Sequence, residues 1–281
     1  MSPQMIAFKD NVEGVLLACH ELLQHPDSEL LFAKDMDELR SKISFSGIES
    51  DLKAVGFRPV ANCSVLVQSL LGKRKSRMSA RDPDVEGYIR LVLRHSSCEP
   101  TELVRFMCSC EGNADMLYSG KTPTGRKYYN YMRDVSRSYH RLSMFARPDF
   151  VNGILSVKVD SPHRIGDMFC RWLSGKNPDL PVAVMEKETA WIGNGRYLGL
   201  ENFTHIRSSF LGSLKFSRET DDVDDLWDIY YDSQMIPVRR NKKHAQHLQP
   251  KSSSAISEMS ARDRYKVERG ISNCTLDNFT G

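Results

Sequence analysis

The chain contains 281 residues, of which 40% are hydrophobic and 27% charged, and it carries a formal net charge of +3. This composition allows one or two domains with buried cores and excludes wholesale disorder. The small excess of positive charge does not identify a partner, because local clustering of charge decides what a protein binds.

The N-terminus and the cysteines bear on where the protein resides. The first residues lack the basic segment and apolar run of a secretory signal. No stretch approaches the roughly 18 apolar residues that a membrane-spanning helix requires. The seven cysteines show no spacing typical of a secreted disulfide framework. We therefore expect a cytoplasmic protein with buried thiols and no membrane partner.

The first 120 residues predict a small mixed unit that leads into helices. A strand over 5–8 precedes a helix that Asn11 caps, and Glu29–Ala33 predicts a second strand. Further helices are predicted over 60–71, from about residue 82, and over 100–118.

Strands and helices alternate after a long helix predicted over 122–142, which Pro123 opens in its first turn. The following elements are strands over 153–159, 181–185 and 189–192, a helix that holds Phe169 and Trp172, and a helix over 221–231. We predict an α+β fold with a mixed N-terminal unit, a helical middle and a mixed, αββαββα-like C-terminal half. Three regions are expected: 1–120, a basic helix with a mixed core over 121–251, and a weakly ordered tail over 252–281.

One predicted helix is rich in arginine. Arg133, Arg137 and Arg141 recur at every fourth position and form one stripe on a helix, with Arg126 seven residues before Arg133. Like charges at this spacing destabilise a helix by roughly 0.2–0.5 kcal/mol per pair, so an anionic partner is expected opposite them. Three interpretations stay open: a surface for nucleic-acid phosphates, a face solvated or paired with acids such as Asp221, and a pocket for a small anion.

A second basic segment over 237–251 contains arginines, lysines and histidines but no acid. Two separate basic elements in one chain favour phosphate binding over a merely solvated surface. His244 and His247 are three residues apart, yet no carboxylate or thiol lies close in sequence to complete a metal site. We expect no metal and no cofactor.

Motifs of known catalytic classes are missing from the sequence. It contains no P-loop, dinucleotide fingerprint, nucleophile elbow or HExxH motif, and Gly193-Asn194-Gly195 is interpreted as a tight turn. Asp160 and His163 are close enough to form an acid–base pair, although a structural turn capped by Asp160 is the alternative. His140, beside the arginine stripe, is another candidate acid or base.

Three segments resemble a bacterial and phage family labelled only as probable DNA metabolism proteins. They are the basic helix over 133–147, a strand–helix–strand unit over 160–184, and a closing signature from Leu226-Trp227 to Pro250-Lys251. Residues 8–23 also resemble the start of that family. The resemblance implies DNA association, a neighbouring radical SAM enzyme of DNA repair or modification and, in some members, fusion to a uracil-DNA glycosylase-like module. It assigns no reaction, and the serines after Lys251 depart from its pattern.

Together, the basic elements and the resemblance predict a DNA-associated protein that acts in base modification or repair with a radical SAM enzyme as partner. Base-edge contacts are predicted from Asn241 and Gln246. Two alternatives stay open: an enzyme acting on DNA bases or nucleotides with His140, Asp160 or His163 as its acid or base, and a structural adaptor that does not touch DNA. Phosphate contacts are predicted from Arg126, Arg133, Arg137, Arg141, Arg147, Arg240 and Lys251.

Overall fold

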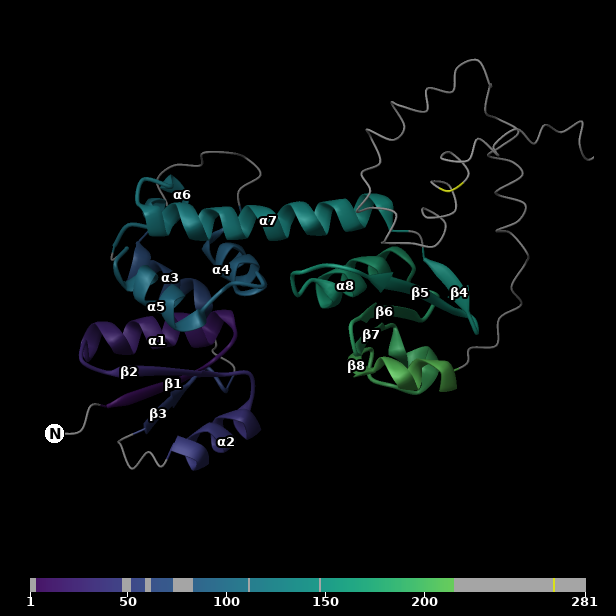
Figure 1. Ribbon diagram of the computed structural model, residues 1–281, viewed down its shortest axis with the longest axis horizontal. Coiled ribbons are helices and arrows are strands. Elements are labelled where there is room, and N and C mark those ends of the chain that lie inside the picture. Colours follow the sequence, from purple (N-terminus) through teal and green to yellow (C-terminus); the bar gives the residue numbers. More distant parts are fainter. Residues whose placement is uncertain are drawn as a thin grey trace, which may run out of the picture. The chain divides into compact units, whose positions relative to one another are not determined.

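The computed structural model describes residues 4–46, 52–58, 62–72, 83–110, 112–146, 148–214 and 265 (Figure 1). It combines helices with two separate sheets, which confirms the predicted α+β class. The chain forms two compact units, residues 1–137 and 138–281, and the division falls inside helix α7 (Pro123–Phe145). The three predicted regions stay a prediction.

A three-stranded parallel sheet organises the first unit, with the strand order β2-β1-β3. Successive parallel strands need crossover connections, and two helices supply them. Asn11 accepts a hydrogen bond from the amide of Gly14 at 2.7 Å, which confirms the predicted N-cap. The elements are β1 (Met5–Lys9), α1 (Val12–Gln24), β2 (Glu29–Ala33), α2 (Met36–Ser46) and β3 (Leu52–Val55).

The sequence did not predict α2 and β3. Leu39 is the buried apolar residue of α2, and Ile43 is only half-buried, so the helical periodicity of this segment is weak. The β3 strand has four residues, with two of them exposed. Tertiary contacts rather than a local sequence pattern define both elements: β3 pairs with β1, and α2 packs against the sheet.

Hydrophobic side chains bury both faces of the parallel sheet. On one face Ile6 and Phe8 of β1 pack into a large core with α1 and the following helices. On the other face Ala7 and Ala33 pack against Leu39 of α2. The additional helices of this unit are α3 (Cys63–Leu71), α4 (Val85–Leu93), α5 (Pro100–Cys108) and α6 (Asp115–Ser119).

Residues 100–118, predicted as one helix, form the two helices α5 and α6. Gly112 lies between them with a φ of +70°, a left-handed conformation that interrupts a right-handed helix. Its amide donates to the carbonyl of Leu70 at 2.9 Å, and the amide of Ala114 donates to Leu71 at 2.8 Å. The turn is therefore anchored to the end of α3, and the single-helix prediction was wrong.

The long helix α7 confirms the prediction for residues 122–142 and extends to Phe145. Its start is fixed by Thr122, whose hydroxyl accepts a hydrogen bond from the amide of Gly125 at 3.0 Å, with Pro123 as the first helical residue. Tyr128 and Met132 join the core of the first unit.

A five-stranded mixed sheet with the order β4-β5-β6-β7-β8 organises the second unit. Strands β5 and β6 are parallel and α8 connects them, whereas the other neighbours are antiparallel. The elements are β4 (Asp149–Val151), β5 (Ile154–Val159), α8 (Gly166–Lys176), β6 (Val182–Glu186), β7 (Thr189–Gly193), η1 (Gly195–Leu198), β8 (Phe203–Arg207) and η2 (Ser208–Ser213).

The order of elements follows the predicted αββαββα pattern up to its sixth element, since α7 is followed by β4, β5, α8, β6 and β7. The residues of β4 had not been assigned to a strand. Strand β8 was not predicted, and the helix predicted over 221–231 lies outside the described residues. Gly193-Asn194-Gly195 forms the predicted turn, in which the Asn194 side-chain amide donates to the carbonyls of Ser174, Asn177 and Leu180 at 3.2, 2.9 and 2.9 Å.

The two faces of the mixed sheet have different covers. Helix α8 contacts β6 and β7 on one face, where a Cβ at Gly193 would lie 2.6 Å from the Cβ of Ser174. On the other face, Ile154, Ala183 and Ile192 form a small core with the partly buried Leu198, Ile206 and Leu211. Strand β8 is an edge strand, and none of its residues is fully buried.

Candidate nucleic-acid interface

Helix α7 has one buried and one exposed face. Tyr128, Met132 and Val135 are buried, because residues three and four apart share a side of a helix. The arginines of the stripe, Arg126, Arg133, Arg137 and Arg141, are all exposed. The helical stripe predicted for Arg133, Arg137 and Arg141 is confirmed. We call these three residues together with Arg126 the α7 arginine face.

The contacts of Arg126, Arg133 and Arg137 leave these three side chains exposed to solvent. Arg126 donates through Nε to the carbonyl of Gly120 at 3.4 Å, and the guanidinium of Arg133 lies 5.7 Å from the ring centroid of Tyr129. Arg137 lies 3.6 Å from a carboxylate oxygen of Asp134, with side chains 62% and 48% exposed. An ion pair this exposed contributes little, about 0–1 kcal/mol, and leaves the arginine able to contact another anion.

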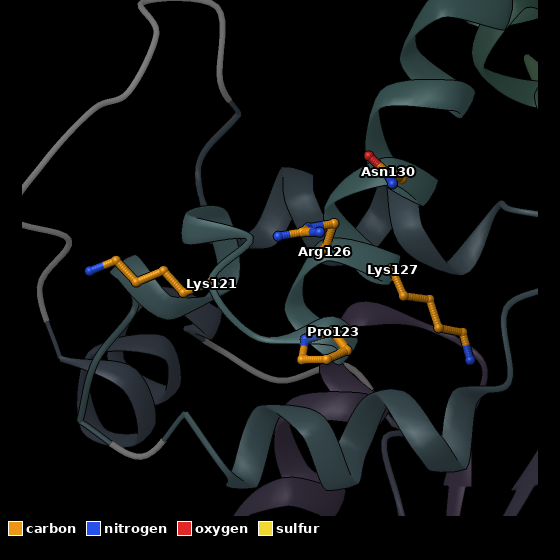
Figure 2. Close-up of a pocket in the computed structure, with 5 residues that line it drawn as sticks. All are labelled: Lys121, Pro123, Arg126, Lys127 and Asn130. Carbon is orange, nitrogen blue, oxygen red and sulfur yellow. The ribbon is translucent and has the colours of Figure 1, made fainter.

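A hollow of about 370 Å³ lies beside the first turns of α7 (Figure 2). In Figure 2 the amines of Lys121 and Lys127 point in opposite directions, with Arg126 between them. The Lys127 amine lies 5.5 and 5.8 Å from the ring centroids of Tyr128 and Tyr131, which orient it. The lining residues are Lys121, Pro123, Arg126, Lys127 and Asn130.

Of the residues that line this hollow, only Arg126 was predicted from the sequence as a site residue. Lys121 and Lys127 belong to the same basic stretch, and Asn130 follows Arg126 by one helical turn. That i, i+4 spacing was the signal that could have added Asn130.

The candidate acids and bases occupy different environments. His140 is exposed on α7, and Asp160 is exposed after β5. His163 lies in the same loop as Asp160 but is buried, with 8% of its surface exposed. The backbone amide of His163 donates to the hydroxyl of Ser161 at 3.1 Å, so a serine supplies the side-chain oxygen of this turn.

Part of the predicted interface lies outside the described residues: Arg147, Arg240, Asn241, Gln246 and Lys251, together with the acidic residues around Asp221.

The cysteines for which a pKa shift is resolved are not activated as nucleophiles. Burial raises the pKa of the Cys110 thiol to about 11 and that of the Cys170 thiol to about 12. Burial also raises the pKa of Cys63, with the nearby charges of Glu13 and Glu86 adding to the effect. A reactive cysteine needs the opposite shift, toward the thiolate.

The part of the chain that the structure describes contains no group of three or more histidine, cysteine, aspartate or glutamate side chains that could hold a metal ion. His95, which the sequence places near three cysteines, stacks on Tyr131 with ring centroids 3.8 Å apart. Across the same residues, every helix is too short or too polar to cross a bilayer.

The fold and the site define an α+β protein with an exposed basic helix face. The chain belongs to the family described as a domain of unknown function, DUF4130, whose model matches residues 99–254. This match extends from the start of α5 through β8 and includes all of α7. A comparison with curated proteins gave no match.

Proposed function

We propose that this protein binds DNA through the α7 arginine face and acts in base modification or repair beside a radical SAM enzyme. The observation that carries the proposal is the exposure of regularly spaced arginines on one side of α7. The radical SAM partner and the repair context rest on the family resemblance of the sequence alone.

The spacing of the charges supports phosphate binding. Residues four apart on a helix are separated by about 6 Å along its axis, so the α7 arginine face presents a row of guanidinium groups rather than one cluster. Each guanidinium can donate two parallel hydrogen bonds to a phosphate. A helix that keeps like charges at this spacing is stabilised when a polyanion lies along it.

The basic hollow adds cations at one end of the same row. Lys121 and Lys127 diverge from Arg126, so together they reach phosphates over a wider arc than the stripe alone. We assign further phosphate contacts to Arg147, Arg240 and Lys251, and base-edge contacts to Asn241 and Gln246.

The test measures the affinity of the full chain for a DNA duplex over a range of salt concentrations. The logarithm of the affinity is expected to fall linearly with the logarithm of salt, by roughly 0.9 for each phosphate contact. The double variant Arg133→Ala/Arg137→Ala should bind all sequences more weakly and flatten this slope by up to about two contacts.

Arg40→Ala is the matched control, because Arg40 is also an exposed helical arginine paired with an aspartate three residues before it, at 3.3 Å. Arg40 lies on α2, which packs on the other face of the parallel sheet from Phe8 and the large core. The control should bind as the unaltered protein does. An equal loss in both variants, or an unchanged slope in the double variant, would remove the α7 arginine face from the interface.

A further inference from the structure

A second surface, in the second unit, combines aromatic rings with cations. The guanidinium of Arg171 on α8 lies 3.6 Å from the ring centroid of Phe203 on β8. Phe203 stacks on Trp191 of β7 with centroids 5.9 Å apart and planes 18° apart. Trp191 in turn lies 5.3 Å from the ring of His205. We call these four residues the stacked ladder.

The ladder lies at the edge of the mixed sheet. Trp191 pairs with His205 across β7 and β8, and Gly193 pairs with Phe203, so the rings occupy adjacent positions on one side of the sheet. Arg207 alternates with Phe203 and His205 along β8 and therefore faces the same side. Among the residues that the structure describes, β8 is the edge strand, so no described strand lies beside this flank of the surface.

Two contacts hold the ladder in place before any ligand arrives. Trp191 donates through its indole nitrogen to a carboxylate oxygen of Glu186 at 3.4 Å. The other oxygen of Glu186 accepts the amides of Ile165 and Gly166, at 3.0 and 3.1 Å, where α8 begins. Both carboxylate oxygens of Glu186 are thus already hydrogen-bonded, and Arg171 and Phe203 order each other.

Planar groups remain accessible at both ends of the ladder. Arg171 and His205 are exposed, and Trp191 and Phe203 are half-buried. Nucleobases stack on guanidinium planes and aromatic rings alike, and the neighbouring Arg207 is exposed and able to hold a phosphate. A surface already ordered in this way loses little side-chain entropy on binding.

We infer that the stacked ladder binds unpaired nucleobases of single-stranded DNA. This inference rests on the proposed DNA association and specifies the form of the nucleic acid. A base-paired duplex hides the faces of its bases, so the ladder selects nucleotides that are already unstacked, such as those at a lesion, a bubble or a single-stranded end.

The experiment compares a short oligothymidylate with an abasic oligomer of the same length, both bound to the full chain. The abasic strand keeps the phosphates and removes the bases. The oligothymidylate is expected to bind about tenfold more tightly. The double variant Phe203→Leu/His205→Ala should lose this difference while keeping its affinity for the abasic strand and the slope of affinity against salt.

Two further variants make the assignment specific. Phe210→Leu is the matched control, since Phe210 is a phenylalanine of η2, outside the ladder, with 58% of its surface exposed. It should keep the full preference for bases. Arg171→Lys keeps the charge but loses the guanidinium plane, so it should weaken the preference for bases without changing the salt slope. Circular dichroism melting curves verify that each variant folds.

The outcomes separate this inference from the proposed function. If the abasic strand binds with a clear salt slope but the bases add nothing, the ladder inference fails while DNA association stands. If neither strand binds but a duplex does, the ladder inference fails while DNA association stands. If the duplex does not bind either, the proposed function itself fails. An unaltered preference for bases in the double variant would place the base-binding surface elsewhere. A single-stranded RNA serves as the last probe. If the double variant loses as much affinity for this RNA as for oligothymidylate, the ladder binds unpaired nucleotides of either sugar and the restriction to DNA is wrong.

Discussion

The two sheets of this protein differ in how completely they are buried. In the parallel sheet the central strand β1 holds Ile6, Ala7 and Phe8, and none of the three is exposed to solvent. In the mixed sheet the edge strand β8 has no fully buried residue, although it too carries aromatic and aliphatic side chains. The first sheet therefore stabilises the fold, whereas the edge of the second leaves ring faces and cations accessible to a ligand.

The contrast follows from the connections between strands. Parallel neighbours require helices between them, and these helices cover both faces of the sheet. Antiparallel neighbours need no crossover helix, and only Lys187 and Glu188 separate β6 from β7. One helix, α8, contacts β6 and β7 on one face. Both surfaces that we propose to bind DNA consist of exposed or half-buried side chains, one on the mixed sheet and one on the outer face of α7.

The largest expected difference compares one phenylalanine from each sheet. Phe8→Ala removes a fully buried ring and should lower the free energy of unfolding of the first unit by about 3–5 kcal/mol. Phe203→Ala removes a half-buried ring and should cost the second unit only about 1 kcal/mol. Helical circular dichroism during urea unfolding reports the first unit. Fluorescence reports the second, which contains all three tryptophans: Trp172, Trp191 and Trp227. Equal losses would remove the contrast between the sheets.

Two glycine-to-alanine substitutions, one in each unit, test the same contrast by adding a single methyl group. A Cβ at Gly14 of α1 would lie 2.1 Å from the carbonyl oxygen of Lys9 at the end of β1. Gly14→Ala should therefore destabilise the first unit by about 3 kcal/mol. A Cβ at Gly175, near the end of α8, would meet nothing within 4 Å. Gly175→Ala should stabilise the second unit by roughly 0.5–1 kcal/mol, because alanine loses less conformational entropy in a helix. Thermal melts should show a lower melting temperature for Gly14→Ala and a higher one for Gly175→Ala than for the unaltered protein.

A further effect is absent at neutral pH and develops only in alkali; it involves Cys170, whose thiol donates to the carbonyl of Trp191 at 3.3 Å. Burial raises its pKa from 9.0 to about 12. Below pH 9 the thiol is protonated in both the folded and unfolded chains, and its contribution to stability is fully present. Between pH 9 and 12 the unfolded thiol ionises while the folded one does not, so stability falls as pH rises.

The slope from this one thiol is at most about 1.4 kcal/mol per pH unit. Cys170→Ala should flatten the alkaline decline of the free energy of unfolding by up to that amount, measured by urea unfolding at each pH. At neutral pH it should lower the free energy of unfolding by about 1 kcal/mol, because a buried sulfur atom is lost. A parallel decline in both proteins would show that other groups, such as the buried tyrosines, account for the alkaline sensitivity. Burial also raises the pKa of Tyr88.

Sequence patterns predicted the strongly periodic elements well. The strand Glu29–Ala33 was predicted with its observed bounds, and α7 was found from its opening proline and its apolar spacing. The missed elements α2, β3 and β8 have few buried residues, so tertiary contacts define them and no local pattern reveals them.

The two candidate surfaces differ in the same way. The α7 arginine face was predictable because its residues lie four apart on one helix. The stacked ladder was not, because Arg171, Trp191 and Phe203 come from three elements and meet only when β7 pairs with β8 under α8. Of its members, only Arg171 lies within the segments that carry the family resemblance.

A contact inside the first unit matters for handling the purified protein. The sulfur atoms of Cys19 on α1 and Cys108 on α5 are 3.0 Å apart. Dissolved oxygen or a peroxide that removes the two thiol hydrogens would join them into a disulfide, with the oxidant reduced to peroxide or water. The new bond would close a covalent loop between positions 89 residues apart. Samples stored without a reductant should then separate into two bands on a non-reducing gel, the cross-linked one migrating faster, and a Cys108→Ala preparation should keep a single band.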